Sequence, residues 1–175
     1  MDAFTCLLKS SIIALLRTDS DLRIQRLAAS LLAGKDLAKA FRPEELAQLL
    51  DYKYFVEKVE PILAKTGGDG KACVICHNSH AIFKLQPPLA DGKFADSVSH
   101  DNFNYALRVI NIAQPESSLI LIKPTRPSDA AGDVNTYEST HNGGQRWPGN
   151  EASPEYQTIL AWIRGARLNT NVATK

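Results

Sequence analysis

The sequence lacks the two features that most simply point to a membrane or to a nucleic acid. No apolar stretch approaches the roughly 18 to 20 residues of a membrane-spanning helix. Its 20 basic and 19 acidic residues nearly cancel, which leaves a formal net charge of +1 over 175 residues. Proteins that bind nucleic acid or anionic lipid usually carry a basic excess. We therefore expect a globular protein with no membrane span and no nucleic-acid partner.

Sulfur-containing residues are also few, because the chain has three cysteines and a single methionine, Met1. Three cysteines cannot all pair, and Cys73 and Cys76 are too close in the sequence to staple a disulfide-rich secreted domain. Structural disulfides therefore do not account for the cysteines.

The apolar run SIIALL near the amino end lacks the charged start, long apolar centre and cleavage site of an export signal.

What the sequence does contain is a dense cluster of metal-binding side chains. The segment KACVICHNSH, residues 71–80, holds two of the three cysteines and two of the four histidines. Within it Cys73, Cys76 and His77 form the pattern C-x-x-C-H. Two cysteines at this spacing place their sulfurs on one helical turn, where they can form thioethers with the vinyl groups on one edge of a haem. The motif predicts one covalently attached c-type haem, with His77 as an axial ligand of its iron.

Two other chemistries use closely spaced cysteines. A structural zinc site needs a second pair of ligands at similar spacing, and the remaining cysteine, Cys6, lies beside Leu7 and Leu8, as expected of a small buried apolar residue. A thioredoxin-like redox pair follows a strand in a βαβ unit, whereas the flanks of this motif have helical patterns. Haem is the interpretation that we favour over both.

Apolar residues at helical spacing divide the chain into two regions. Residues 1–50 contain two apolar stripes that predict a helical hairpin similar to the repeat unit of HEAT-type arrays. Residues 51–170 predict a haem-binding domain, and residues 171–175 form a tail. No alternating pattern is long enough to indicate a sheet. We therefore expect an all-α protein.

Several helices of the second region have recognisable ends. The segment DYKYFVEKVEPILAK, 51–65, predicts a helix that Pro61 kinks. SPEYQTILAWIRGAR, 153–167, opens with a serine cap and a proline in the first turn and stops at glycine. Shorter helices are expected in SHDNFNYALRVI, 99–110, and PESSLILIKP, 115–124.

The order of these segments resembles that of the class I cytochromes c, in which the first and last helices cross and hold the haem. It is more similar to the haem domains that end large exported proteins of planctomycetes and their relatives, often behind HEAT-like repeats. The resemblance implies haem attachment outside the cytoplasm, with the export signal on a longer precursor. The matching stretches are FVEKVEPIL, GDGKACVICHNSH, NYALRVIN, PESSLILIKP, HNGGQRW and SPEYQTILAWIRGA.

The second axial ligand cannot follow the usual class I pattern, in which a methionine reaches the iron from a loop before the last helix. The chain has only Met1, but His141 in STHNGGQRWP lies in the corresponding region, followed by two glycines that let the backbone approach a porphyrin closely. We expect His141 to be this ligand, with His100 and Lys123 as alternatives. His80 is disfavoured, because on a continuing helix it shares a face with the motif histidine.

Other residues are expected around the haem. By resemblance, a proline carbonyl accepts a hydrogen bond from the second nitrogen of His77, and the candidates are Pro87 and Pro88. Arg146, Lys123 and Trp147 are expected to border the pocket as donors to the haem propionates.

Two neutral imidazoles would saturate the iron and leave no position for oxygen or peroxide. We therefore expect an electron-transfer module that exchanges electrons with a redox partner protein or domain. The alternative is a haem enzyme or gas sensor, in which His141 is an acid, a base or a hydrogen-bond donor beside an open iron position. A third hypothesis makes residues 1–50 a protein-binding scaffold. No motif indicates hydrolase or nucleotide chemistry.

Overall fold

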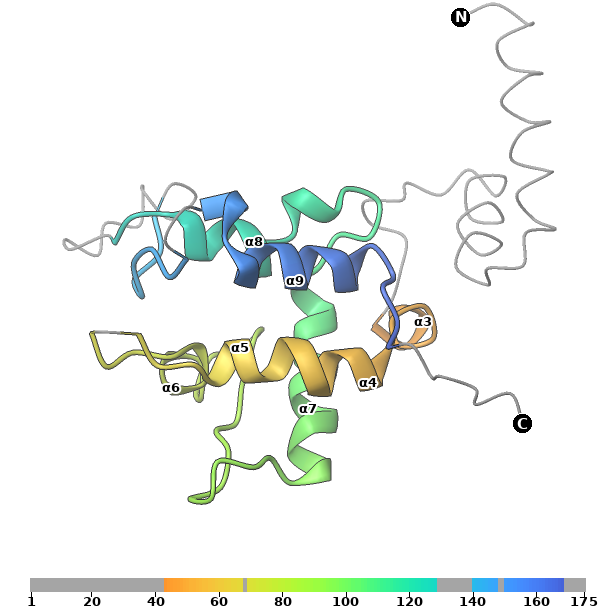
Figure 1. Ribbon diagram of the computed structural model, residues 1–175, viewed down its shortest axis with the longest axis horizontal. Coiled ribbons are helices and arrows are strands. Elements are labelled where there is room, and N and C mark those ends of the chain that lie inside the picture. The colour runs from red at the N-terminus through yellow and green to blue at the C-terminus, as the bar shows by residue number, and fades with distance from the viewer. Residues whose placement is uncertain (1–42, 68, 129–139, 148–149, 169–175) are drawn as a thin grey trace, which may run out of the picture. The chain divides into compact units, whose positions relative to one another are not determined.

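The computed structural model describes residues 43–67, 69–128, 140–147 and 150–168 (Figure 1). The chain divides into two compact units, Met1–Leu49 and Leu50–Lys175. In the first unit the described part contains α3 (Pro43–Leu46), which begins at a proline, a residue suited to a first helical turn. The hairpin expected in residues 1–42, Cys6 and the tail at 171–175 all lie outside the described residues.

The second unit opens with one helical segment made of α4 (Tyr52–Tyr54), the π-helical turn η1 (Phe55–Val59) and α5 (Glu60–Ala64). Asp51 caps this segment, because its Oδ1 accepts a hydrogen bond from the backbone N–H of Tyr54 at 2.9 Å. Pro61 has no N–H to continue ordinary helical bonding, and the wider π turn lies directly before it. The helix therefore continues through the proline as far as Ala64.

The last helix, α9 (Pro154–Ile163), has the ends that the sequence predicted. Its cap is Ser153, whose Oγ accepts from the backbone N–H of Tyr156 at 3.2 Å. The chain leaves the helix at Gly165, which has a φ of 90°, in the left-handed region that glycine adopts without strain. This prediction is confirmed.

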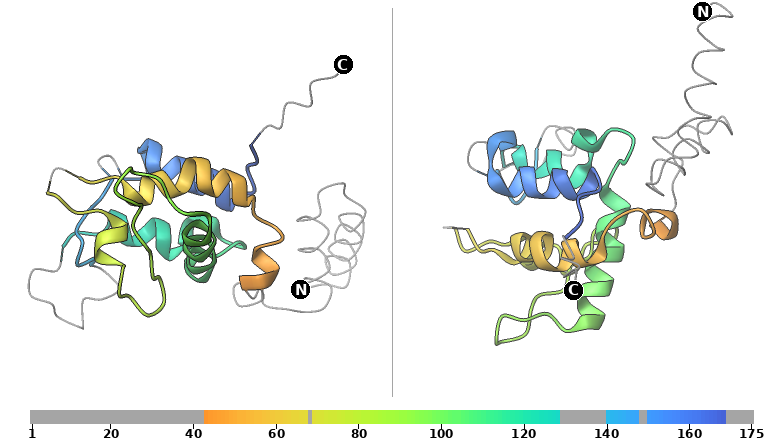
Figure 2. Two further views of the ribbon diagram at one scale, coloured as in Figure 1. Left: turned by 90° about the horizontal axis from the view of Figure 1, so that it is seen from below. Right: turned by 45° about the vertical axis from the view of Figure 1, so that its right-hand side comes forward.

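α9 packs antiparallel to the first helical segment (Figures 1 and 2). Near one end, Nε1 of Trp162 donates to the carbonyl of Asp51 at 3.2 Å. Near the other end, Nζ of Lys65 lies 2.6 Å from Oε1 of Glu155. Contacts at both ends align the two helices along their lengths. We expected the first and last helices to cross, and we find this alignment instead.

α7 (Asp96–Ala106) runs across the direction of these two helices in Figure 1. Its Phe103 joins Phe55 and Trp162 in a cluster of three aromatic rings, whose centroids lie 5.3 to 6.0 Å apart. These are ordinary packing distances between aromatic rings. The helix begins three residues before Ser99, the first residue of the segment in which a helix was expected.

The remaining described elements are short. They are α6 (Cys73–Cys76), η2 (Leu107–Val109), η3 (Pro115–Ser117), α8 (Leu119–Ile122), η4 (Lys123–Thr125) and η6 (Asn150–Ala152). The described ranges hold helices and no strand, as the all-α prediction requires. None of the helices in these ranges combines the length and the hydrophobicity of a membrane span.

Candidate functional site

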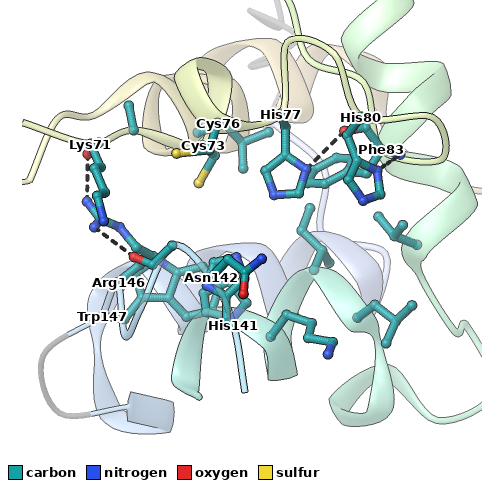
Figure 3. A pocket seen from close by; sticks show the side chains of 18 of the residues that line it. Lys71, Cys73, Cys76, His77, His80, Phe83, His141, Asn142, Arg146 and Trp147 are labelled. Carbon is teal, nitrogen blue, oxygen red and sulfur yellow. Dashed lines mark hydrogen bonds between the residues drawn. The ribbon is translucent and has the colours of Figure 1, made fainter. Parts of the chain in front are cut away.

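A cavity of about 380 Å³ lies between α6 and the segment 140–147 (Figure 3). Its volume is in the range of about 300 to 1,000 Å³ that is usual for cofactor sites. Cys73, Cys76 and His77 line one wall, and His141 lines the opposite wall. Apolar contacts to the cavity come from Leu63, Phe83, Val109, Leu119, Ile120, Pro124 and Trp147.

The motif wall is a single helical turn. The backbone N–H of His77 donates to the carbonyl of Cys73 at 2.9 Å, which closes the turn and ends α6. Both cysteines are free thiols, with Cys73 partly buried and Cys76 exposed. Figure 3 shows Cys73, Cys76 and His77 projecting from this turn on the side of the cavity. Two sulfurs and an imidazole are thus offered to one ligand from one direction.

The acidity of Cys73 argues against a redox-active thiol pair. Burial raises the pKa of the Cys73 thiol to about 11. Thioredoxin-like cysteines instead have a lowered pKa, because the thiolate is the reactive form. Cys73 is therefore a protonated thiol at neutral pH.

His77 is held in one tautomer by the backbone. Its Nδ1 lies 3.1 Å from the carbonyl oxygen of Phe83, and a carbonyl can only accept, so Nδ1 carries the proton. Nε2 is then the nitrogen with the lone pair that a metal needs. Burial, followed by the neighbouring His80, lowers the pKa of His77 to about 4, so the ring is neutral at pH 7.

The acceptor for His77 is Phe83, and the expectation of Pro87 or Pro88 is wrong. The reason is the path of the chain after α6, which ends at Cys76 and turns back on itself. The N–H of Leu85 donates to the carbonyl of His77 at 3.0 Å. The turn places the carbonyl of Phe83, six residues after His77, against the imidazole before the chain reaches either proline.

The sequence predicted His80 on a continuing helix, but α6 ends at Cys76 and His80 lies outside it. It lies in the turn, where its Nδ1 accepts from the N–H groups of Phe83 at 3.1 Å and Ile82 at 3.3 Å. Its ring centroid is 5.1 Å from that of His77. The exposed His80 thus caps the turn that carries the acceptor of His77.

His141 shows the same arrangement on the opposite wall. Its Nδ1 lies 2.9 Å from the carbonyl oxygen of Gly144, so this ring also keeps its proton on Nδ1 and its lone pair on Nε2. Burial lowers the pKa of His141, and the charges of Lys123 and Arg146 add to this effect while the Gly144 carbonyl opposes it. The N–H of His141 also donates to the carbonyl of Pro127 at 2.9 Å.

The two imidazoles face each other across the cavity. The ring centroids of His77 and His141 are 6.3 Å apart, and the ring planes differ by 24°. An imidazole nitrogen binds a metal at about 2 Å, so two rings on opposite sides of one metal have centres about 6 Å apart. The observed separation fits a single metal atom between the two rings.

The alternative sixth ligands occupy different places. His100 is an exposed residue of α7 whose ring stacks on Tyr52 at 4.2 Å and lies 3.7 Å from a carboxylate oxygen of Asp96. It does not line the cavity. Lys123 does line the cavity, and its Nζ donates to the carbonyl of Thr140 at 3.2 Å.

Arg146 and Trp147 also line the cavity, as expected of segments beside a haem. Trp147 is buried and packs edge-on against Tyr156, with ring centroids 5.8 Å apart. Arg146 forms an ion pair with Asp69 on the motif side, a residue that no sequence motif singles out. A glycine-rich turn carries no signal of its distant partner, so Asp69 could be found only from the structure.

In the described ranges, no group of three or more His, Cys, Asp or Glu side chains lies close enough together to hold a metal ion by itself. A haem iron takes four of its ligands from the porphyrin, so two protein ligands suffice.

Comparisons with protein families, with curated proteins and with solved structures gave no match.

Proposed function

We propose that the second unit binds one c-type haem through Cys73 and Cys76, with His77 and His141 as axial ligands, and that it transfers electrons. The proposal rests above all on the matched state of the two imidazoles. Each ring donates a hydrogen bond from its Nδ1–H to a backbone carbonyl, and the two ring centroids lie 6.3 Å apart, with the rings on opposite walls. Two neutral rings in the tautomer that leaves Nε2 to bind a metal are what an iron with two axial histidines needs.

The cavity supports the same interpretation. Its walls are mostly apolar, and the two cysteine side chains project from the wall that also carries His77. When bound, the haem supplies a one-electron ferric and ferrous couple. Its apolar lining would cover part of the haem, and the polarity of this shell is one of the factors that would set the potential of such a couple.

The chain's own residues favour electron transfer over catalysis. Two axial imidazoles would occupy both open positions of the iron, so none is left for a substrate. The carbonyls of Phe83 and Gly144 increase the basicity of the two imidazoles through their Nδ1 protons. More basic ligands favour ferric iron and lower the reduction potential.

The proposed setting follows from the family resemblance of the helices and the motif. We infer that the unit is a c-type cytochrome domain in a larger exported protein, and that haem attachment takes place outside the cytoplasm. Its partner would be a redox protein or another domain of the same chain. Locating the full-length product in cell fractions tests the compartment independently of the haem.

The first experiment measures haem attachment. The chain is produced behind an export signal in a bacterium that attaches c-type haem, and its intact mass and pyridine haemochrome spectrum are recorded. We expect the mass of one added haem, together with a low-spin ferric electron paramagnetic resonance (EPR) signal. An unmodified mass would contradict the proposal and would favour zinc binding or redox chemistry at the cysteines.

Variants separate the roles of the four residues. Replacing both Cys73 and Cys76 with alanine should abolish covalent attachment, whereas Cys6→Ala serves as the matched control and should not. His141→Ala should convert the iron to a high-spin form that binds carbon monoxide, and His100→Ala should leave it low-spin. Carbon monoxide binding to the reduced wild-type protein would instead favour the haem enzyme or gas sensor.

A further inference from the structure

Arg146 links the two segments that carry the proposed iron ligands. Its Nη1 and Nη2 atoms donate to Oδ2 and Oδ1 of Asp69 at 2.8 and 3.2 Å, a two-pronged ion pair. Nη2 also donates to the carbonyl of Lys71 at 2.6 Å, and Nη1 to the carbonyl of Gly143 at 3.3 Å. One guanidinium group thus contacts Asp69 and Lys71 before the C-x-x-C-H motif and Gly143 after His141.

The partners on the motif side form a tight turn. The N–H of Lys71 donates to Oδ1 of Asp69 at 3.1 Å, and the N–H of Gly67 donates to the carbonyl of Lys71 at 2.9 Å. A Cβ atom at Gly67 would lie 2.5 Å from Nη2 of Arg146, so the turn packs directly against the guanidinium group. The turn therefore offers Arg146 a carboxylate that is already oriented.

The segment on the other side is equally well tied. The N–H of Arg146 donates to the carbonyl of Pro124 at 2.7 Å, and the N–H of Gly144 donates to the carbonyl of His141 at 2.6 Å. His141 and Arg146 therefore belong to one short, internally bonded loop. A displacement of the guanidinium group would be passed to the imidazole through this loop.

The ion pair differs from an ordinary surface pair. The Arg146 side chain is 12% exposed and that of Asp69 is 46% exposed. Two parallel hydrogen bonds from a planar guanidinium group fix both distance and orientation, which a lysine cannot reproduce. Hydrogen bonding from Arg146 lowers the pKa of Asp69 to about 2, so the carboxylate is charged at any physiological pH.

We propose that Arg146, held by Asp69, is a positioning residue that sets the spacing between the two axial imidazoles. This inference rests on the proposed function, because it assumes that His77 and His141 bind one iron. His77 and His141 come from separate segments, and the guanidinium group bonds both segments directly. Loss of the two-pronged ion pair between Arg146 and Asp69 lets the His141 loop move away from the motif wall and weakens the bond between His141 and the iron.

The test uses the exported, haem-loaded chain and its conservative variants Arg146→Lys and Asp69→Asn. The matched controls are Arg164→Lys and Glu116→Gln, which weaken an exposed ion pair between Arg164, the residue after α9, and Glu116 of η3. Circular dichroism and thermal unfolding show which variants are folded. Spin state is read by EPR, and affinity for added cyanide by optical titration.

We expect Arg146→Lys and Asp69→Asn to raise the high-spin fraction and to increase the affinity for cyanide about tenfold, equivalent to about 1.4 kcal/mol. The control variants should change neither quantity. Wild-type spin state and cyanide affinity in folded Arg146→Lys and Asp69→Asn would overturn the inference, since a residue that only stabilises the fold would change the unfolding temperature alone. A wild-type chain without covalent low-spin haem would contradict the proposed function itself.

Discussion

Gly143 lies against the imidazole ring of His141. A Cβ atom at position 143 would be 2.9 Å from Cε1 of His141 and 3.4 Å from both ring nitrogens. The nearest of these distances is shorter than real Cβ contacts, so either the ring or the loop would have to move. The position of His141 therefore depends on the absence of a side chain two residues later.

This contact predicts the effect of Gly143→Ala. The added methyl group should displace the His141 ring and raise the high-spin fraction of the ferric protein, while the mass still shows one covalent haem. EPR and intact mass measure the two quantities. Gly92→Ala is the control, because a Cβ there has nothing within 4 Å. Its φ of 81° strains an alanine backbone, which that of Gly143 does not, so this control shows what backbone strain alone does to the spin state. An unchanged spin state in Gly143→Ala would contradict the prediction.

A buried carboxyl group predicts a pH-dependent stability. Glu60 is 1% exposed and accepts hydrogen bonds from Ser99 Oγ at 2.7 Å and Asn102 Nδ2 at 2.9 Å. Burial raises its pKa, and the two hydrogen bonds oppose this only in part. The folded state therefore binds the Glu60 proton more tightly than the unfolded chain does. Its contribution to stability is complete below the unfolded pKa of about 4.3 and is lost as pH rises through the folded value.

Glu60→Gln should remove this pH dependence. A neutral amide can accept from Asn102 and donate to Ser99, so the variant should be more stable than the wild type at pH 7 and should show a flatter profile. Glu60→Ala leaves both partners buried without their acceptor and should cost about 1 to 3 kcal/mol. Urea unfolding between pH 4 and pH 8 measures both effects, and a Glu60→Gln profile parallel to that of the wild type would refute the explanation.

His80 should influence His77, the proposed iron ligand, without itself binding the iron. His80→Ala removes the acceptor for the N–H groups of Ile82 and Phe83, and we expect a loss of about 1 kcal/mol in unfolding free energy. The Phe83 carbonyl is then less firmly held against His77, so the reduction potential should rise. Redox titration measures the shift. His80→Asn, which can also cap a turn, should recover part of both effects, and His100→Ala should leave the potential unchanged.

The alignment of the two long helices can be tested at Trp162. Its indole is fully buried, and Nε1 donates to the carbonyl of Asp51. Trp162→Phe keeps an aromatic ring but removes one of the two donors to that carbonyl, which still accepts from the N–H of Phe55 at 3.1 Å. We therefore expect a loss of about 1 kcal/mol in stability. Urea unfolding checks the value. A spin state equal to that of the wild type is expected at the same time, because Trp162 does not line the cavity.

The sequence alone determined the features that depend on residues close together in the chain. The serine cap at Ser153, the stop at Gly165 and the apolar spacing of α9 are local, and the structure has each of them where they were predicted. The same holds for the motif, because the side chains of Cys73 and Cys76 lie on the same turn of any helix that contains them. Helical geometry requires nothing from the rest of the protein.

Tertiary structure decided the contacts between distant segments. The sequence could nominate His141, but only the folded chain places its ring 6.3 Å from that of His77. Asp69 was not recognised as the partner of Arg146, and Phe83 replaced two prolines as the acceptor of His77. Every residue has a backbone carbonyl, and an aspartate in a turn has no mark of its partner. Which groups meet is decided by how the helices pack, because packing sets the path of the loops between them.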